Sequence, residues 1–226
     1  KAESAKLLRD YVNKNATQKL PQKIDPKQYH LSLSKSLYKN KDYGLALIEI
    51  ETAAKLSPDD QKVQEILVGM YSLFLRLDKT EEAVSRLIES AKDNNRLKSR
   101  GYQEWGDIAI LRGKIDKAKE LYEKAKELGD PQGVAKTTLA EFPESGTPIN
   151  RLPLNPNELF IDPANSLNRK GEIFAHFGMY QRALGIYSMI LRMEPSNLPA
   201  LLNMATVNYK SEKYNRTISI LERLLI

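Results

Sequence analysis

Small residues recur along this chain at a nearly constant spacing. Ala46, Ala83, Ala118 and Ala183 each stand four residues before a large apolar residue, and successive alanines are separated by 37, 35 and 65 residues. Thr217 follows 34 residues after the last alanine. A period of this length is typical of proteins built from stacked, repeated units, which present an extended surface to other molecules. The sequence therefore predicts a repeat protein that binds something, but it does not name the partner.

The unit at residues 99–132 shows most clearly what one repeat contains. A helical stripe that includes Trp105 and Gly106 is followed by Gly113, and glycine commonly ends a helix. A second apolar stripe at helical spacing begins at Ala118. Two helices joined by so short a turn form an antiparallel pair. We expect Gly106 and Ala118 to face each other so that the helices approach closely, with Trp105 packed beside them.

This unit resembles the tetratricopeptide repeat, whose pattern runs aromatic, glycine, alanine, aromatic, alanine and proline. The matching residues are Trp105, Gly106, Ala118, Tyr122, Ala125 and Pro131. Three further units, 27–60, 64–97 and 164–197, follow the same pattern, and a last one begins near Leu198. The Sel1-like repeat is a related alternative. The resemblance implies an all-α fold, an α-solenoid of antiparallel helix pairs wound into a right-handed superhelix.

Segments outside the repeats divide the chain into four parts. We expect a capping helix and linker at 1–26, repeats one to three at 27–132, and repeats four and five at 164–226, the last of them truncated. Five prolines interrupt the intervening segment 133–163, which we interpret as an irregular insert or hinge, or as a degenerate repeat. A short helix is expected at 134–142. Further along the segment 133–163, the apolar residues Leu159, Phe160 and Ile161 favour docking of this segment on the solenoid over disorder.

Composition excludes several classes of function. The chain has no cysteine and two histidines, and it contains no phosphate-binding glycine loop or metal-ligand motif. We therefore predict no catalytic residues, no cofactor and no metal, and we do not expect an enzyme. No apolar run is long enough to cross a bilayer. The absence of cysteine favours a cytoplasmic protein, or a bacterial periplasmic one if an N-terminal signal has been removed.

The resemblance also predicts which residues contact a partner. In similar proteins the first helix of each pair lines a concave groove, and helical register then selects the residues that face it. This mixture of apolar, amide and charged groups suits an extended peptide or a helix of a partner protein. The predicted groove residues are Gln28, Leu31, Lys35, Tyr38, Ser72, Arg100, Gln103, Asp107, Asn168, Glu172, Leu202, Thr206 and Tyr209.

Two other functions stay open at this point. The formal net charge of +6 is compatible with a helical-repeat RNA-binding module. However, no pair of base-reading side chains recurs from unit to unit, which makes nucleic acid the weaker hypothesis. A structural spacer is the other alternative, because apolar residues surround the final helix. We expect that helix either to continue into further chain, which we favour, or to pack on a second copy.

Overall fold

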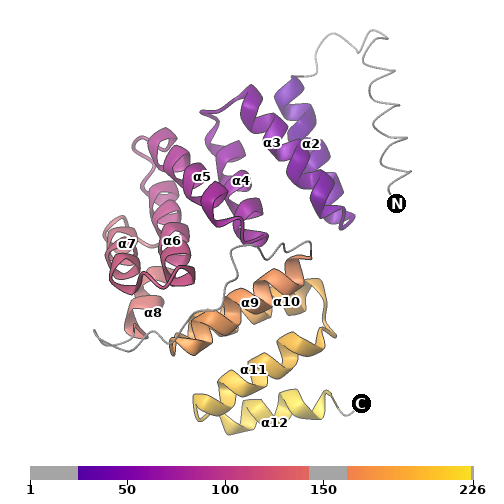
Figure 1. The fold of residues 1–226 in the computed structure, drawn as a ribbon, viewed down its shortest axis with the longest axis vertical. Helices are drawn as coiled ribbons and strands as arrows, with labels where there is room; N and C mark the ends of the chain where they lie inside the picture. The colour runs from indigo at the N-terminus through magenta and orange to yellow at the C-terminus, as the bar shows by residue number, and fades with distance from the viewer. Residues whose placement is uncertain (1–24, 143–161, 225–226) are drawn as a thin grey trace. The chain divides into compact units, whose positions relative to one another are not determined.

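The computed structural model describes residues 25–142 and 162–224, and all regular elements within these ranges are α-helices (Figure 1). The expected capping helix before residue 25 and the expected docking of Leu159, Phe160 and Ile161 lie outside the described residues. The chain divides into two compact units, residues 1–57 and 58–226. The boundary follows Ser57, near the end of the first predicted repeat at 27–60.

The described part of the first unit is one helix pair, α2 (Pro26–Lys39) and α3 (Tyr43–Leu56). Asp25 accepts a hydrogen bond from the Lys27 amide, and Pro26 occupies the first helical position, which together start α2. The Ser34 hydroxyl donates to the Ala46 carbonyl oxygen at 2.8 Å inside the pair. The hydroxyl of Ser34 therefore satisfies its hydrogen bond within the interface that buries it.

The described part of the second unit contains four more helix pairs, with one short helix after the second of them. The first two pairs are α4 (Gln61–Leu73) with α5 (Leu77–Ser90) and α6 (Asn95–Leu111) with α7 (Ile115–Glu127). The short helix α8 (Val134–Ala140) forms where 134–142 was predicted. The last two pairs are α9 (Pro163–His176) with α10 (Tyr180–Met193) and α11 (Leu198–Lys210) with α12 (Tyr214–Glu222). This arrangement is an all-α solenoid of antiparallel pairs.

A residue with positive φ marks the turn inside every pair and fixes the register of the repeats. These residues are Lys41, Leu75, Gly113, Gly178 and Glu212. Five positions after each lies a small side chain that is at most 9% exposed: Ala46, Thr80, Ala118, Ala183 and Thr217. The sequence analysis placed Ala83 in this series, and that register is wrong by three residues. Thr80 occupies the position instead, and its hydroxyl donates to the Arg76 carbonyl oxygen at 2.8 Å.

In two of the pairs, a glycine on the first helix faces a tyrosine sixteen positions later. A Cβ atom built on Gly106 would lie 3.0 Å from the Tyr122 ring, and one on Gly171 would lie 2.4 Å from the Tyr187 ring. The nearest neighbour of Gly106 on α7 is therefore the Tyr122 ring, and the predicted approach to Ala118, one turn earlier on the same helix, stays a prediction. Both tyrosines are almost fully buried. Glycine is needed at these two positions because the aromatic ring fills the space that a side chain would occupy.

Helix α6 is one turn longer than the first helices of the other pairs. It has 17 residues, whereas α2, α4, α9 and α11 have 13 or 14. The additional residues lie at its N-terminal end, because the distance from its first residue to the turn residue Gly113 is correspondingly longer. Asn94 starts this turn by accepting a hydrogen bond from the Leu97 amide. The extra turn carries Arg96, which contributes to the site described next.

Trp105 is less buried than the sequence analysis predicted. Its side chain is partly exposed, its ring stacks on Tyr102 with centroids 6.5 Å apart, and its Nε1 donates to Glu81 at 2.9 Å. The fully buried aromatic residue of this pair is Tyr122. Trp105 therefore connects α6 to α5 at the surface, and Tyr122 fills the core of the α6–α7 pair.

Candidate functional site

Helix α9 packs against the first helices of both preceding pairs in its unit. Besides its partner α10, it contacts α6 and α4, whereas α8 takes the place beside α7. The hydroxyl of Ser166 donates to the Leu73 carbonyl oxygen at the end of α4. Glu141, which follows α8, accepts hydrogen bonds from the Gln181 amide at the start of α10. The face of α4 and α6 that was predicted to be open is therefore partly covered by the chain itself.

A buried cluster of charged side chains joins α9 and α10 to α6. The Asp107 carboxylate is 1% exposed and lies 2.6 Å from both the Lys170 ammonium and the Arg182 guanidinium. The Tyr122 hydroxyl donates to the other carboxylate oxygen of Asp107. Lys170 also lies 3.3 Å from the Ser72 hydroxyl of α4. Asp107 is thus the counter-charge that both cations share, and Glu104, 3.9 Å from the Lys170 ammonium, is a more distant second one.

The charges of this cluster determine the ionisation of its members. Burial alone would raise the pKa of Asp107, but the positive charges of Arg182 and Lys170 outweigh it and lower that pKa to about 2. Burial and the neighbouring Asp107 charge both raise the pKa of Tyr122 well above its usual value. Asp107 is therefore ionised and Tyr122 protonated at neutral pH, which is the state that their hydrogen bond requires.

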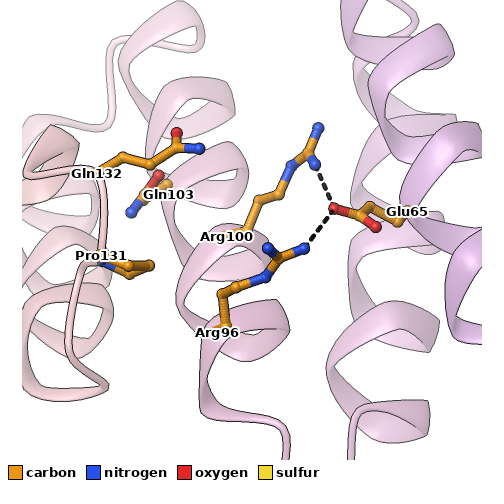
Figure 2. A pocket seen from close by; sticks show the side chains of 6 residues that line it. All are labelled: Glu65, Arg96, Arg100, Gln103, Pro131 and Gln132. Carbon is orange, nitrogen blue, oxygen red and sulfur yellow. Dashed lines mark hydrogen bonds and ion pairs between the residues drawn. The ribbon is translucent and has the colours of Figure 1, made fainter.

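A second polar site in the same unit is open to solvent. It is a pocket of about 160 Å³ between α4, α6 and the loop after α7, lined by Glu65, Arg96, Arg100, Gln103, Pro131 and Gln132 (Figure 2). Glu65 comes from α4, both arginines come from α6, and Pro131 and Gln132 form the opposite wall. A drug-sized ligand needs roughly 300–1,000 Å³, so this pocket has room for one side chain or a chain terminus.

The two arginines of the pocket share a single carboxylate. Arg100 donates to Glu65 Oε1, and a terminal nitrogen of Arg96 lies 3.8 Å from the same oxygen. The side chains of Arg96 and Arg100 are 71% and 47% exposed, whereas that of Glu65 is 20% exposed. One positive charge is therefore uncompensated within the pocket. The pocket also lies at the N-terminal end of α6, where the helix dipole disfavours cations and favours an anion.

Gln103 shapes the wall of this pocket from the α6 side. It is 9% exposed, and its amide donates to the Asp130 carboxylate at 2.8 Å. The second oxygen of Asp130 accepts from the Lys136 amide at the start of α8. These bonds hold the loop that carries Pro131 and Gln132 against α6. The position of the opposite wall is therefore determined by α6 and α8 together.

The structure distributes the predicted groove residues over several environments. In the first unit Gln28 and Lys35 are exposed, Tyr38 is half-buried against Tyr43, and Leu31 is packed inside the helix pair. In the second unit Ser72 and Asp107 contact Lys170 of α9, and Arg100 and Gln103 line the pocket. The remaining predicted residues lie on α9 and α11: Asn168, which is buried and bonded to Asn197, and the exposed residues Glu172, Leu202, Thr206 and Tyr209.

Sequence reasoning missed the partners of these residues. Lys170 and Arg182 were not selected, although they are the cations that Asp107 neutralises. Arg96 was missed because the repeat pattern has no position for the extra turn of α6. The spacing of Arg96 and Arg100, one helical turn apart, was the only signal in the sequence that could have found the pocket.

The described helices thus define a helical-repeat protein built from antiparallel helix pairs. The family model of the tetratricopeptide repeat-like domain matches residues 10–142, which is more than half of the chain. The protein belongs to this family. A search of curated proteins gives no match.

Several solved structures are similar to this chain. TTC0263, a thermophilic TPR protein of Thermus thermophilus, has 17% identity and a TM-score of 0.44, covering 88% of this chain and 90% of its own. PilW, a widely conserved type IV pilus biogenesis factor, has 16% identity and a TM-score of 0.44, covering 88% and 76%. YrrB, a TPR protein with an unusual peptide-binding site, has 12% identity and a TM-score of 0.37, covering 85% and 81%. Such identities indicate nothing about function.

Within residues 25–142 and 162–224, no three His, Asp or Glu side chains converge as metal ligands would. No helix in this part of the chain is long and apolar enough to span a membrane. The buried Asp107 cluster and the open arginine pocket are two polar sites of the described second unit.

Proposed function

We propose that this protein is a non-enzymatic scaffold that binds a polypeptide segment of a partner protein, with the Arg96–Arg100 pocket receiving an acidic group of that segment. Proteins of the tetratricopeptide repeat family generally mediate protein–protein interaction. The observation that carries the proposal is the pocket's charge: two exposed guanidinium groups share one carboxylate. A carboxylate from a partner would complete the neutralisation.

The Asp107 cluster does not serve this purpose, although Asp107 and Ser72 were predicted groove residues. Its carboxylate is almost inaccessible and already contacts two cations of the same chain. Arginine, in contrast, binds carboxylates with two parallel hydrogen bonds, and the two exposed guanidinium groups of the pocket share only the one carboxylate of Glu65. Recognition therefore belongs to the open pocket, and the buried cluster holds the helices that surround it.

The proposal is tested with peptides selected for binding to the protein. A displayed library of random twelve-residue peptides is selected on the wild-type chain, and the affinity of the enriched peptides is measured by titration calorimetry. Acidic residues should be enriched, and R96Q/R100Q should weaken binding by at least tenfold, as expected from the loss of two charge-assisted hydrogen bonds. Because both side chains are exposed, the substitutions should leave the melting temperature unchanged.

A matched control uses another exposed arginine. Arg86 on α5 forms a similar surface ion pair with Glu82 and does not line the pocket, so R86Q should not change peptide affinity. Peptides that bind without acidic enrichment, and equally well to R96Q/R100Q, would contradict the role of the pocket. If a labelled RNA oligonucleotide binds and is lost steeply with salt while no peptide is selected, the protein is instead a nucleic-acid binder.

A further inference from the structure

Glu65 lies where a bound acidic group would meet the two arginines of the pocket. Arg100 donates to Glu65 Oε1, and Arg96 Nη2 lies 3.8 Å from that same oxygen (Figure 2). Each guanidinium group carries several N–H donors in a planar fork, and a single carboxylate oxygen cannot accept from all of them. Donors of both arginines therefore remain for a second carboxylate, which can bind in the pocket without displacing Glu65.

Glu65 is also the least exposed of the three charged groups. Its side chain is 20% exposed, whereas those of Arg96 and Arg100 are 71% and 47% exposed. Water and salt screen exposed charges strongly, but they screen partly buried charges much less. The negative charge of Glu65 therefore acts on any group that enters the pocket, and a ligand must bind beside it.

A second negative charge lies behind the wall of the pocket. The Asp130 carboxylate accepts hydrogen bonds from the Gln103 side-chain amide and from the Lys136 backbone amide, both at 2.8 Å. Neither donor carries a charge, so these bonds do not neutralise Asp130. Because Gln103 itself lines the pocket, the Asp130 charge is one side chain away from the ligand. Asp130 therefore adds to the effect of Glu65 and limits how much negative charge the pocket can accept.

The charge balance of the pocket decides which acidic group fits. Two arginines and one glutamate leave a single positive charge among the lining residues. A carboxylate supplies one negative charge and completes the balance. A phosphoserine supplies about 1.5 to 2 negative charges at pH 7, so part of its charge would face Glu65 without a counter-charge. The helix dipole of α6 attracts both anions and does not discriminate between them.

We propose that Glu65 is a specificity-determining residue, which makes the Arg96–Arg100 pocket bind a singly charged carboxylate and reject a doubly charged group such as phosphoserine. Like charges brought together in a binding site cost affinity, and proteins use such repulsion against unwanted ligands. The inference rests on the proposed function of the pocket and adds the charge of the ligand to it. An acidic side chain and a C-terminal carboxylate share this chemistry.

The test compares three libraries of synthetic twelve-residue peptides in which all other positions are random neutral residues. The first has a central glutamate and the second a central phosphoserine, both with blocked termini, and the third has a free C-terminal carboxylate as its single acidic group. Each library is screened on wild type and E65Q, and the best binders are titrated with glutamate and phosphoserine exchanged. The better of the two carboxylate libraries identifies the source of the carboxylate.

The expected preferences of the two proteins are opposite. Wild type should bind the carboxylate peptides about tenfold more tightly than their phosphoserine counterparts, because the phosphate adds negative charge beside Glu65. E65Q should bind the phosphoserine peptides about tenfold more tightly than wild type does, because two positive charges are then without a counter-charge in the pocket. The matched control is E82Q, which changes the net charge by the same amount at a carboxylate outside the pocket and should behave as wild type.

Two results would overturn the inference. Phosphoserine peptides that bind wild type as tightly as their glutamate counterparts would show that Glu65 excludes nothing. Weaker binding of the glutamate peptides to E65Q would show that Glu65 serves to orient the arginines. R96Q/R100Q separates this inference from the proposed function. If no library yields a binder, or if the binders are insensitive to R96Q/R100Q, the proposed function fails as well, whereas arginine-dependent binding with either of the two results above contradicts only the role of Glu65.

Discussion

Replacing Asp107 by asparagine should destabilise the second unit strongly. The substitution keeps the shape of the side chain but removes the charge that lies 2.6 Å from both Lys170 and Arg182. It also places an amide donor among groups that are themselves donors. Lys170 is 5% exposed and cannot regain water without moving α9 away from α6. Breaking a buried ion pair on one side typically costs about 3–5 kcal/mol.

The pKa of Asp107 gives a second, independent magnitude. A fall from its ordinary value to about 2 corresponds to roughly 2 kcal/mol of stability from the ionised form. This is the smaller figure because a protonated Asp107 still offers a carbonyl oxygen to its donors, whereas asparagine also adds an unwanted donor. We therefore expect D107N to cost about 3 kcal/mol, measured by urea denaturation at pH 7 with tryptophan fluorescence, since Trp105 lies on the same helix.

Two further variants make this prediction specific. E82Q removes an exposed carboxylate that pairs with Arg86 at 3.9 Å, and it should cost less than about 0.5 kcal/mol. K170M in the D107N background should recover part of the loss, because it removes a buried cation whose remaining carboxylate partner, Glu104, is 3.9 Å away. A D107N protein as stable as E82Q would refute the reasoning, since Lys170 and Arg182 would then not depend on the Asp107 charge.

Three other predictions address the same helices. The stability difference between wild type and D107N should be complete above pH 4 and should shrink as the pH falls toward 2, because the depressed pKa of Asp107 contributes stability that is lost when the carboxylate is protonated. Urea midpoints of both proteins at pH 7, 4 and 2.5 test this. A stability difference that stays constant over this range would contradict it. G171A should destabilise the protein by about 1–3 kcal/mol, and more than G106A does. The added Cβ would lie 2.4 Å from the Tyr187 ring in G171A, compared with 3.0 Å from the Tyr122 ring in G106A. Equal melting temperatures of the two variants would disprove the close fit at Gly171. W105A should cost about 2 kcal/mol by chemical denaturation, below the roughly 3–5 kcal/mol of a buried aromatic, since Trp105 is partly exposed; a larger loss would mean that it belongs to the core.

The sequence predicts the helix pairs because their two determinants are local. A small residue near the start of the second helix and a turn residue five positions earlier recur in each pair. The register of the second pair was misplaced because alanine was sought and Ala83 was found, whereas Thr80 occupies the site. A threonine can fill it because its hydroxyl bonds to the preceding turn of its own helix. Size, and not residue type, is what the site selects.

The contacts of α9 could not be predicted from the same pattern. Lys170 and Asp107 are 63 residues apart, and nothing in either neighbourhood indicates that one neutralises the other. The repeat pattern assigned Asp107 to an open groove because it treats every first helix as equivalent. Pairing between distant charges depends on how the helix after residue 161 meets α4 and α6, and periodicity carries no information about that. The extra turn of α6, which brings Arg96 to the pocket, is likewise a departure from the period.

The most direct test of the account measures coupling between the pocket and an acidic residue of a bound peptide. A peptide selected on the wild-type chain is compared with its glutamate-to-glutamine variant, and both are titrated against wild type and R96Q/R100Q. We predict that the peptide substitution weakens binding to wild type by about tenfold and hardly affects binding to the arginine variant, a coupling of about 1.4 kcal/mol. Equal effects of the peptide substitution on both proteins would show that the acidic group binds elsewhere.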